Sequence, residues 1–141
     1  MKDIFKSRGY EIELELRSPI TVVNGDSATG KSFFYYLMSR VKGRDDIICI
    51  NYESTRPKAN YDALVKIVEN SNNKMIIIDQ ADDIQRENDS LMYAINTDKG
   101  NNTFIVIGRS PKLIYNVSDI AEIKIGNNKI KLEYSFPEPL F

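Results

Sequence analysis

Eight residues near the start of the chain have the types and spacing of a phosphate-binding loop. They are Gly25, Asp26, Ser27, Ala28, Thr29, Gly30, Lys31 and Ser32. Glycines at the first and sixth positions permit backbone angles that other residues resist, so that successive N–H groups turn inward around a phosphate. In such a loop the Lys31 ammonium lies near the β and γ phosphates, and the Ser32 hydroxyl is placed to ligate Mg²⁺.

The residues on either side predict the strand and the helix that this loop requires. Pro19 precedes an apolar run at 20–23, which predicts a buried strand. Four apolar residues then recur at the i, i+3, i+4 and i+7 spacing of a core-facing helix: Phe34, Leu37, Met38 and Val41. The positive end of this helix dipole would add to the phosphate site. A glycine turn that binds nothing is the alternative interpretation.

The composition is that of one soluble domain. We expect the 141 residues to form a single domain over 1–141, which is long enough to bury a sizeable core. The net charge of −1 gives no electrostatic argument for binding nucleic acid or an anionic membrane. The chain contains no histidine, which excludes His-based catalysis and His-containing metal sites.

Several features predict a cytoplasmic protein. Cys49 lies in the apolar run 47–50, where we expect a buried thiol and neither a disulfide nor a metal ligand. Residues 1–8 lack the apolar segment of a signal peptide. No apolar run approaches the roughly 20 residues that a membrane-spanning helix needs.

Strands and helices alternate along the chain. We predict strands at 10–16, 20–23, 47–52, 75–79, 103–107, 120–125 and 129–134, and helices after Gly30, from Asn60 and over 89–96. The first strand has Glu11, Glu13 and Glu15 on one face, which indicates a half-exposed strand, antiparallel at a sheet edge, whose acidic face is solvated. The expected fold class is α/β: a three-layer sandwich with a mainly parallel sheet, an antiparallel N-terminal strand and a C-terminal β-hairpin.

Three candidate functional segments each follow the end of an apolar strand. They are the loop at 25–32, Asp79 and Arg109. Ligands of parallel sheets bind at the carboxyl ends of the strands. We therefore expect one rim of the sheet to gather all three.

Two of these segments resemble the motifs of the P-loop NTPase superfamily. Gly25 to Ser32 resembles the Walker A motif, and Met75 to Asp79 resembles the Walker B motif. The resemblance implies ATP and Mg²⁺ as cofactors, with Asp79 holding the metal opposite Ser32, directly or through water. The motifs lie about 45 residues apart with one strand and one helix between them. This arrangement is similar to the AAA, ABC and RecA-like ATPases, in which a further strand lies between the two motif strands of the sheet.

Other branches of the superfamily fit less well. Residues 79–82 lack the Asp-x-x-Gly pattern of GTPases, and no Asn-Lys-x-Asp guanine motif occurs. Small-molecule kinases generally need an arginine-rich lid, whereas Arg40 and Arg44 lie at the far end of the first predicted helix. P-loops read phosphates, so ATP is an expectation from the resemblance and the base preference stays open.

Gln80 departs from the pattern of related ATPases, which carry a glutamate at this position to polarise the attacking water. A neutral amide can orient a water but cannot accept its proton. The carboxylate of Asp82, Asp83 or Glu53 is an alternative base, although helix capping is the favoured role for Asp82 and Asp83. The sequence therefore predicts either a slow ATPase or a nucleotide-dependent binder.

Arg109 follows the apolar run 104–107 and Gly108, where AAA-type proteins place a γ-phosphate sensor and STAND-type ATPases often place arginine. A guanidinium grips phosphate oxygens in bidentate fashion; a surface arginine at a strand end is the alternative. With Lys31 and Gln80, Arg109 completes the candidate catalytic set. We expect an ATP-binding protein with weak or partner-dependent hydrolysis, acting with another protein or a second copy. The alternative is a non-hydrolysing regulatory module derived from a larger ATPase, so whether the chain is an enzyme stays open.

Overall fold

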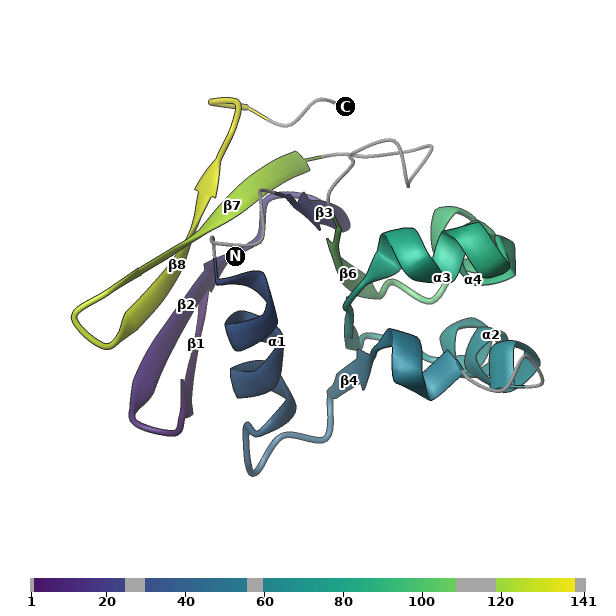
Figure 1. Ribbon diagram of the computed structural model, residues 1–141, viewed down its shortest axis with the longest axis horizontal. Helices are drawn as coiled ribbons and strands as arrows, with labels where there is room; N and C mark the ends of the chain where they lie inside the picture. The colour runs from purple at the N-terminus through teal and green to yellow at the C-terminus, as the bar shows by residue number, and fades with distance from the viewer. Residues whose placement is uncertain (1, 25–29, 56–59, 109–118, 139–141) are drawn as a thin grey trace.

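The computed structural model describes residues 2–24, 30–55, 60–108 and 119–138, which form one curled sheet covered by helices (Figure 1). The strands described are β1 (Lys2–Ser7), β2 (Tyr10–Glu15), β3 (Ile20–Val23), β4 (Ile47–Ile50), β5 (Met75–Ile78), β6 (Thr103–Ile107), β7 (Asp119–Gly126) and β8 (Lys129–Tyr134). The helices described are α1 (Lys31–Ser39), the short 3₁₀ helix η1 (Tyr52–Thr55), α2 (Asn60–Asn70), α3 (Ala81–Glu87) and α4 (Ser90–Asn96). Across the sheet the order is β1-β2-β8-β7-β3-β6-β5-β4.

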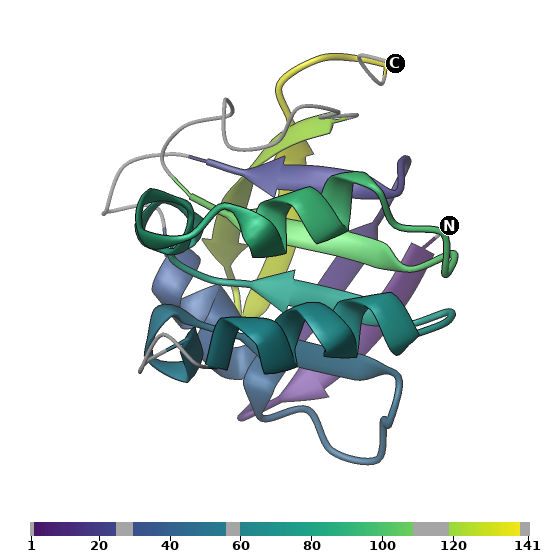
Figure 2. The same cartoon turned by 90° about the vertical axis from the view of Figure 1, so that its right-hand side faces the viewer.

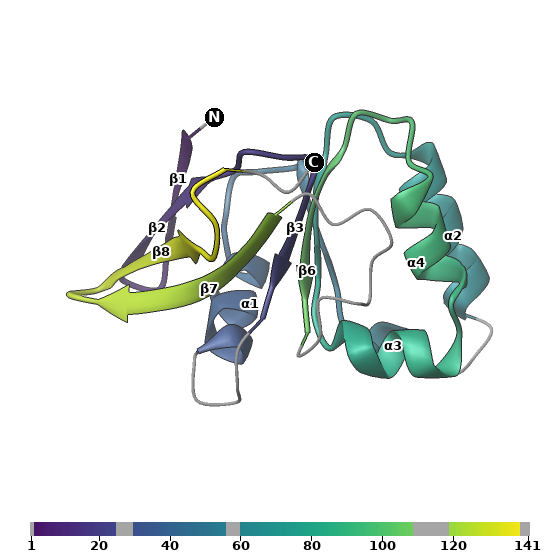
Figure 3. The same ribbon diagram turned by 90° about the horizontal axis from the view of Figure 1, so that it is seen from above.

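The parallel part of the sheet consists of β7, β3, β6, β5 and β4. All four residues of β3 and of β5 are buried, as their predominantly apolar sequences predict for strands covered on both faces. α1 packs on one face, while α2, α3 and α4 lie over the other (Figures 2 and 3). This arrangement confirms the three-layer α/β fold with a mainly parallel sheet.

The remaining strands extend the sheet beyond β7. β7 and β8 form the expected antiparallel hairpin, β8 runs parallel to β2, and β1 pairs antiparallel with β2. The predicted edge position of β2 is therefore wrong, because β1 lies outside it. β1 docks on the α1 face through Phe5, which is 2% exposed, and through Ser7, whose hydroxyl donates to the Leu37 carbonyl at 2.7 Å.

The acidic row of β2 lies opposite lysines from both neighbouring strands. Glu13 forms ion pairs with Lys2 at 3.2 Å and with Lys131 at 3.4 Å, and Glu11 pairs with Lys129 at 3.8 Å. The hydrogen bond from Lys2 lowers the pKa of Glu13. Cross-strand ion pairs therefore offset the charges of Glu11 and Glu13, in a row that the sequence predicts to be solvated.

The helices differ from the prediction mainly at α3. α2 begins at Asn60, and α4 corresponds to the helix expected over 89–96. The residues after Asp79 form the additional helix α3, separate from α4. None of the helices in the described ranges has the length and apolar character that a bilayer crossing needs.

Candidate functional site

The strand order brings the two predicted motif strands to one rim of the sheet. β6 lies between β3 and β5, so a strand separates them, as the resemblance implied. Val23 pairs with Ile107, and Ile78 pairs with Val106, so the three strands end almost level. Beyond them, the Gly108 N–H donates to the Val23 carbonyl at 3.0 Å.

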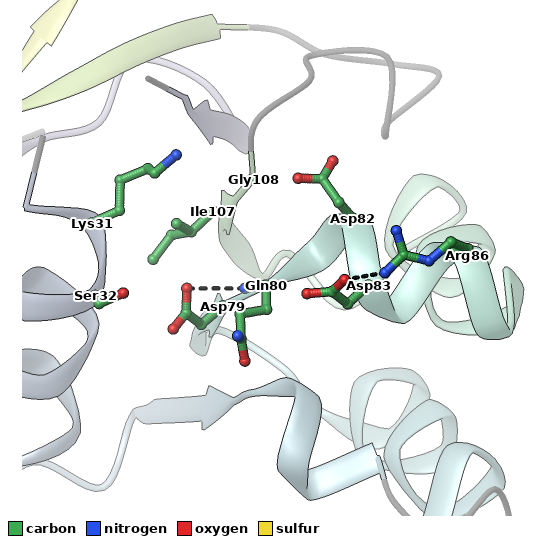
Figure 4. Close-up of a pocket in the computed structure, with 9 residues that line it drawn as sticks. All are labelled: Lys31, Ser32, Asp79, Gln80, Asp82, Asp83, Arg86, Ile107 and Gly108. Carbon is green, nitrogen blue, oxygen red and sulfur yellow. Dashed lines mark hydrogen bonds and ion pairs between the residues drawn. The ribbon is translucent and has the colours of Figure 1, made fainter. Parts of the chain in front are cut away.

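A pocket of about 390 Å³ opens at this rim. The residues that line it are Lys31, Ser32, Asp79, Gln80, Asp82, Asp83, Arg86, Ile107 and Gly108. Figure 4 shows Lys31 and Ser32 on one side of the pocket and Asp82, Asp83 and Arg86 on the other, with Asp79 and Gln80 between them. Segments that are far apart in the sequence thus place cations, carboxylates and a hydroxyl around one space.

Lys31 and Ser32 are the first two residues of α1. Gly30 precedes them with a φ of 85°, and its carbonyl accepts a hydrogen bond from the Phe34 N–H at 2.9 Å, which closes the first helical turn. Phe34, Leu37 and Met38 are buried and hold α1 against the sheet. The lysine and serine therefore have a fixed backbone at the pocket. Of the other predicted site residues, Gly25, Asp26, Ser27, Ala28, Thr29 and Arg109 lie outside the described residues.

Asp79 is the carboxylate at the end of β5. Burial raises its pKa, and this effect is opposed by a hydrogen bond from the Gln80 N–H to Asp79 Oδ1 at 2.9 Å and by the charge of Lys31. Burial thus disfavours the charged form of this carboxylate, whereas a nearby cation favours it.

The residues at the pocket fit a magnesium ion that is bound together with a nucleotide. Mg²⁺ prefers oxygen ligands and is usually bound by one or two carboxylates, waters and substrate phosphates. The Ser32 hydroxyl and the Asp79 carboxylate supply oxygen atoms of this kind at the same pocket. The described part of the chain contains no group of three or more metal-binding carboxylates or thiols that would form an all-protein cage.

Gln80 has the backbone conformation that directs α3 to the pocket. Its φ of 52° and ψ of 44° lie in the left-handed region, which costs a non-glycine residue about 1–2 kcal/mol. The turn starts α3 directly at the strand end, with Ala81 and Ile84 buried. The first-turn residues Asp82 and Asp83 consequently line the pocket. Glu53, in the exposed part of η1, is not among the described residues that line it.

Arg86 lines the pocket although no sequence motif pointed to it. It lies one turn after Asp82 and forms an ion pair with Asp83 at i−3 (Figure 4). The sequence signal for this position is the Asp-x-x-Arg spacing. This spacing predicts an ion pair only if residues 81–87 form a helix, because residues three apart are neighbours on a helix. The prediction of a helix over 89–96 left Arg86 in the connection before it.

No family model matches the chain, and no curated protein matches it. Among solved structures, the crystal structure of the FIGL-1 AAA domain in complex with ADP is similar to it, with a TM-score of 0.41 and 14% sequence identity. The match covers 68% of this chain and 38% of the FIGL-1 chain, so this chain spans less than half of the length of that neighbour.

Proposed function

We propose that this protein binds Mg-ATP at the pocket and hydrolyses it weakly or only with a partner, in the manner of a P-loop NTPase. One observation carries the proposal: Lys31, Ser32 and Asp79, picked out by two separate sequence motifs, line the same pocket at the carboxyl rim of a parallel sheet. That rim is where sheets of this kind bind their ligands.

Each of these residues has a distinct part in the proposed complex. The segment 25–30 surrounds the phosphates with backbone N–H groups, and Lys31 neutralises the β and γ phosphates. Ser32 and Asp79 hold Mg²⁺, which supplies charge neutralisation on the phosphate oxygens. Arg109, which follows the pocket residue Gly108, reads the γ-phosphate.

Hydrolysis is limited by the residue at position 80. The Gln80 amide orients a water but does not accept its proton, and loss of a general base typically costs about 10²–10⁴ in rate. Asp82 and Asp83 line the pocket, so they are the candidate substitutes for the missing base. A protein partner or a second copy of the chain would supply whatever the site lacks. We place this activity in the cytoplasm.

The second candidate function is a regulatory module that binds the nucleotide without turning it over. The neutral Gln80 favours this function. The other residues of the proposed binding site are compatible both with hydrolysis and with binding alone. Both functions require nucleotide binding, so binding is tested first and turnover second.

Thermal unfolding with and without Mg-ATP tests binding. Ligand at 100 times its dissociation constant adds about 2.7 kcal/mol to the free energy of unfolding, which a thermal scan resolves. We expect Lys31→Ala to abolish the shift and Lys66→Ala, which removes an exposed lysine from α2, to retain it. A wild-type protein whose melting temperature does not respond to millimolar Mg-ATP contradicts both candidate functions.

A turnover assay then separates the two functions. In Gln80→Glu a carboxylate replaces the amide, and we expect phosphate release to rise by about 10²-fold or more if the site is otherwise assembled. A variant that binds Mg-ATP but remains inactive supports the regulatory module. The wild-type protein and Lys31→Ala serve as the references for slow turnover and for loss of binding.

A further inference from the structure

Among the described residues that line the pocket, Arg86 and Lys31 have cationic side chains. Lys31 begins α1 and Arg86 lies on α3, so the two cations approach the pocket from opposite sides (Figure 4). The motif resemblance assigns Lys31 to the phosphates and assigns nothing to Arg86.

The ion pair that holds Arg86 is weak. The Arg86 side chain is 71% exposed and that of Asp83 is 34% exposed. Pairs at this exposure contribute little to stability, because water screens the charges and two side chains lose freedom. Asp83 remains accessible to water when Arg86 leaves it, so separating the pair leaves no buried, uncompensated charge.

We propose that Arg86 exchanges its partner, from Asp83 to the terminal phosphate of a bound nucleoside triphosphate, and thereby distinguishes triphosphate from diphosphate. This inference rests on the proposed function. A guanidinium binds phosphate oxygens in bidentate fashion, and such charge-assisted pairs are stronger than an exposed carboxylate pair. A diphosphate lacks the terminal group, so Arg86 stays on Asp83 and contributes nothing to its affinity.

The exchange requires only a side-chain rotation, because α3 is fixed by its other contacts. Ala81 and Ile84, on the inner face of α3, are fully buried. At its end, the Glu87 carboxylate accepts a hydrogen bond from the Tyr61 hydroxyl at 3.2 Å and another from the Tyr52 hydroxyl. The backbone at position 86 is therefore held while its long side chain remains exposed.

Dissociation constants for Mg-ATP and Mg-ADP, measured by calorimetry on single and double variants, test the exchange. We expect Arg86→Ala to weaken Mg-ATP binding about tenfold and Mg-ADP binding less than about twofold. Arg86→Lys keeps the charge without the bidentate geometry, so its loss of Mg-ATP affinity should be intermediate. Arg40→Ala, which removes an exposed arginine at the far end of α1, is the control and should change neither constant.

Asp83→Ala separates partner exchange from simple charge repulsion. It frees Arg86, so Mg-ATP binding should tighten in the wild-type background and show no gain in the Arg86→Ala background. Equal tightening in both backgrounds means that Asp83 acts by repulsion only, which overturns the exchange.

The failure of this inference is distinguishable from that of the proposed function. An unchanged ratio of Mg-ATP to Mg-ADP affinity in Arg86→Ala, with tight binding by the wild type, overturns the role of Arg86 and leaves the nucleotide site standing. A wild-type protein that binds neither nucleotide overturns both. Circular dichroism of each variant establishes that it is folded before its constants are compared.

Discussion

Ile125 lies against Gly30 at the start of α1: a Cβ atom on Gly30 would stand 2.6 Å from Ile125 Cδ1. Ile125 belongs to β7, and its hairpin with β8 continues past the level at which β3 pairs with β7. Gly30 also has a φ of 85°, a conformation that L side chains rarely adopt. The backbone and the neighbouring strand thus both favour glycine at the last position before Lys31.

We expect Gly30→Ala to lower the free energy of unfolding by about 1–2 kcal/mol, from the left-handed backbone alone, and to weaken nucleotide binding by displacing Lys31. Gly9 has a φ of 83°, and a Cβ atom added there would meet nothing within 4 Å, so Gly9→Ala carries the backbone cost only. Gly9→Ala should therefore lose similar stability yet keep its affinity. Adding Ile125→Ala to Gly30→Ala removes the clash with the new Cβ atom, so it should recover only the steric part of the loss. If Gly9→Ala weakens nucleotide binding as much as Gly30→Ala does, the effect of Gly30→Ala on binding is not local.

Asp79→Asn should stabilise the nucleotide-free protein while it removes the magnesium dependence of binding. Burial raises the pKa of Asp79, so the folded chain disfavours the carboxylate that is charged at pH 7. Asparagine removes this charge and keeps an oxygen to accept from the Gln80 N–H. Thermal scans with and without Mg²⁺ and ATP measure both effects. A lower melting temperature for the nucleotide-free variant would show that the charge of Asp79 is already compensated.

Much of the fold follows from short apolar runs. The run 75–78 is buried throughout, and its length and flanking polar residues indicate a covered parallel strand and not a helix. The same reasoning places 20–23 and 103–107 correctly. β1 was missed because its Lys-Asp-Ile-Phe-Lys-Ser pattern has a single large buried apolar residue, Phe5, and because its other buried residue, Ser7, is polar and donates its hydroxyl to the Leu37 carbonyl on α1.

The part of the candidate site that lies at the ends of the parallel strands could be predicted from the sequence. Lys31, Ser32 and Asp79 meet because parallel strands end at one rim, and a sequence pattern is sufficient for that conclusion. Arg86 depends on the direction of α3, which the left-handed turn at Gln80 determines. Since a non-glycine residue rarely adopts this conformation, propensity alone gives no reason to expect it there.

Cys49 should react slowly with alkylating reagents until the pH approaches 11. Burial on β4 raises the pKa of its thiol to about 11, so only about one molecule in 1,000 carries the thiolate at pH 8. Because this pKa lies above that of the unfolded chain, stability should fall as the pH rises from about 9 to 11. Mass spectrometry of iodoacetamide adducts measures the rate, with urea-unfolded protein as the control. A native rate that levels off near pH 9 would contradict the raised pKa.

Asn102 and Thr21 are both buried and polar, yet we expect opposite effects when their polar groups are removed. Asn102 accepts from the Lys74 N–H and donates to the Ser71 carbonyl, each at 2.9 Å, so Asn102→Ala leaves buried groups unpaired and should cost about 2–4 kcal/mol. Within the part of the chain that the structure describes, Thr21 Oγ1 is buried with no hydrogen-bond partner.

Thr21→Val keeps the shape of the side chain and removes its orphaned hydroxyl, so it should be neutral or stabilising by about 1 kcal/mol. Urea unfolding at equal m-values measures both variants. If Thr21→Val destabilises the protein as much as Asn102→Ala does, the Thr21 hydroxyl has a hydrogen-bond partner in the folded protein. The prediction that the two substitutions change the free energy of unfolding differently would then be wrong.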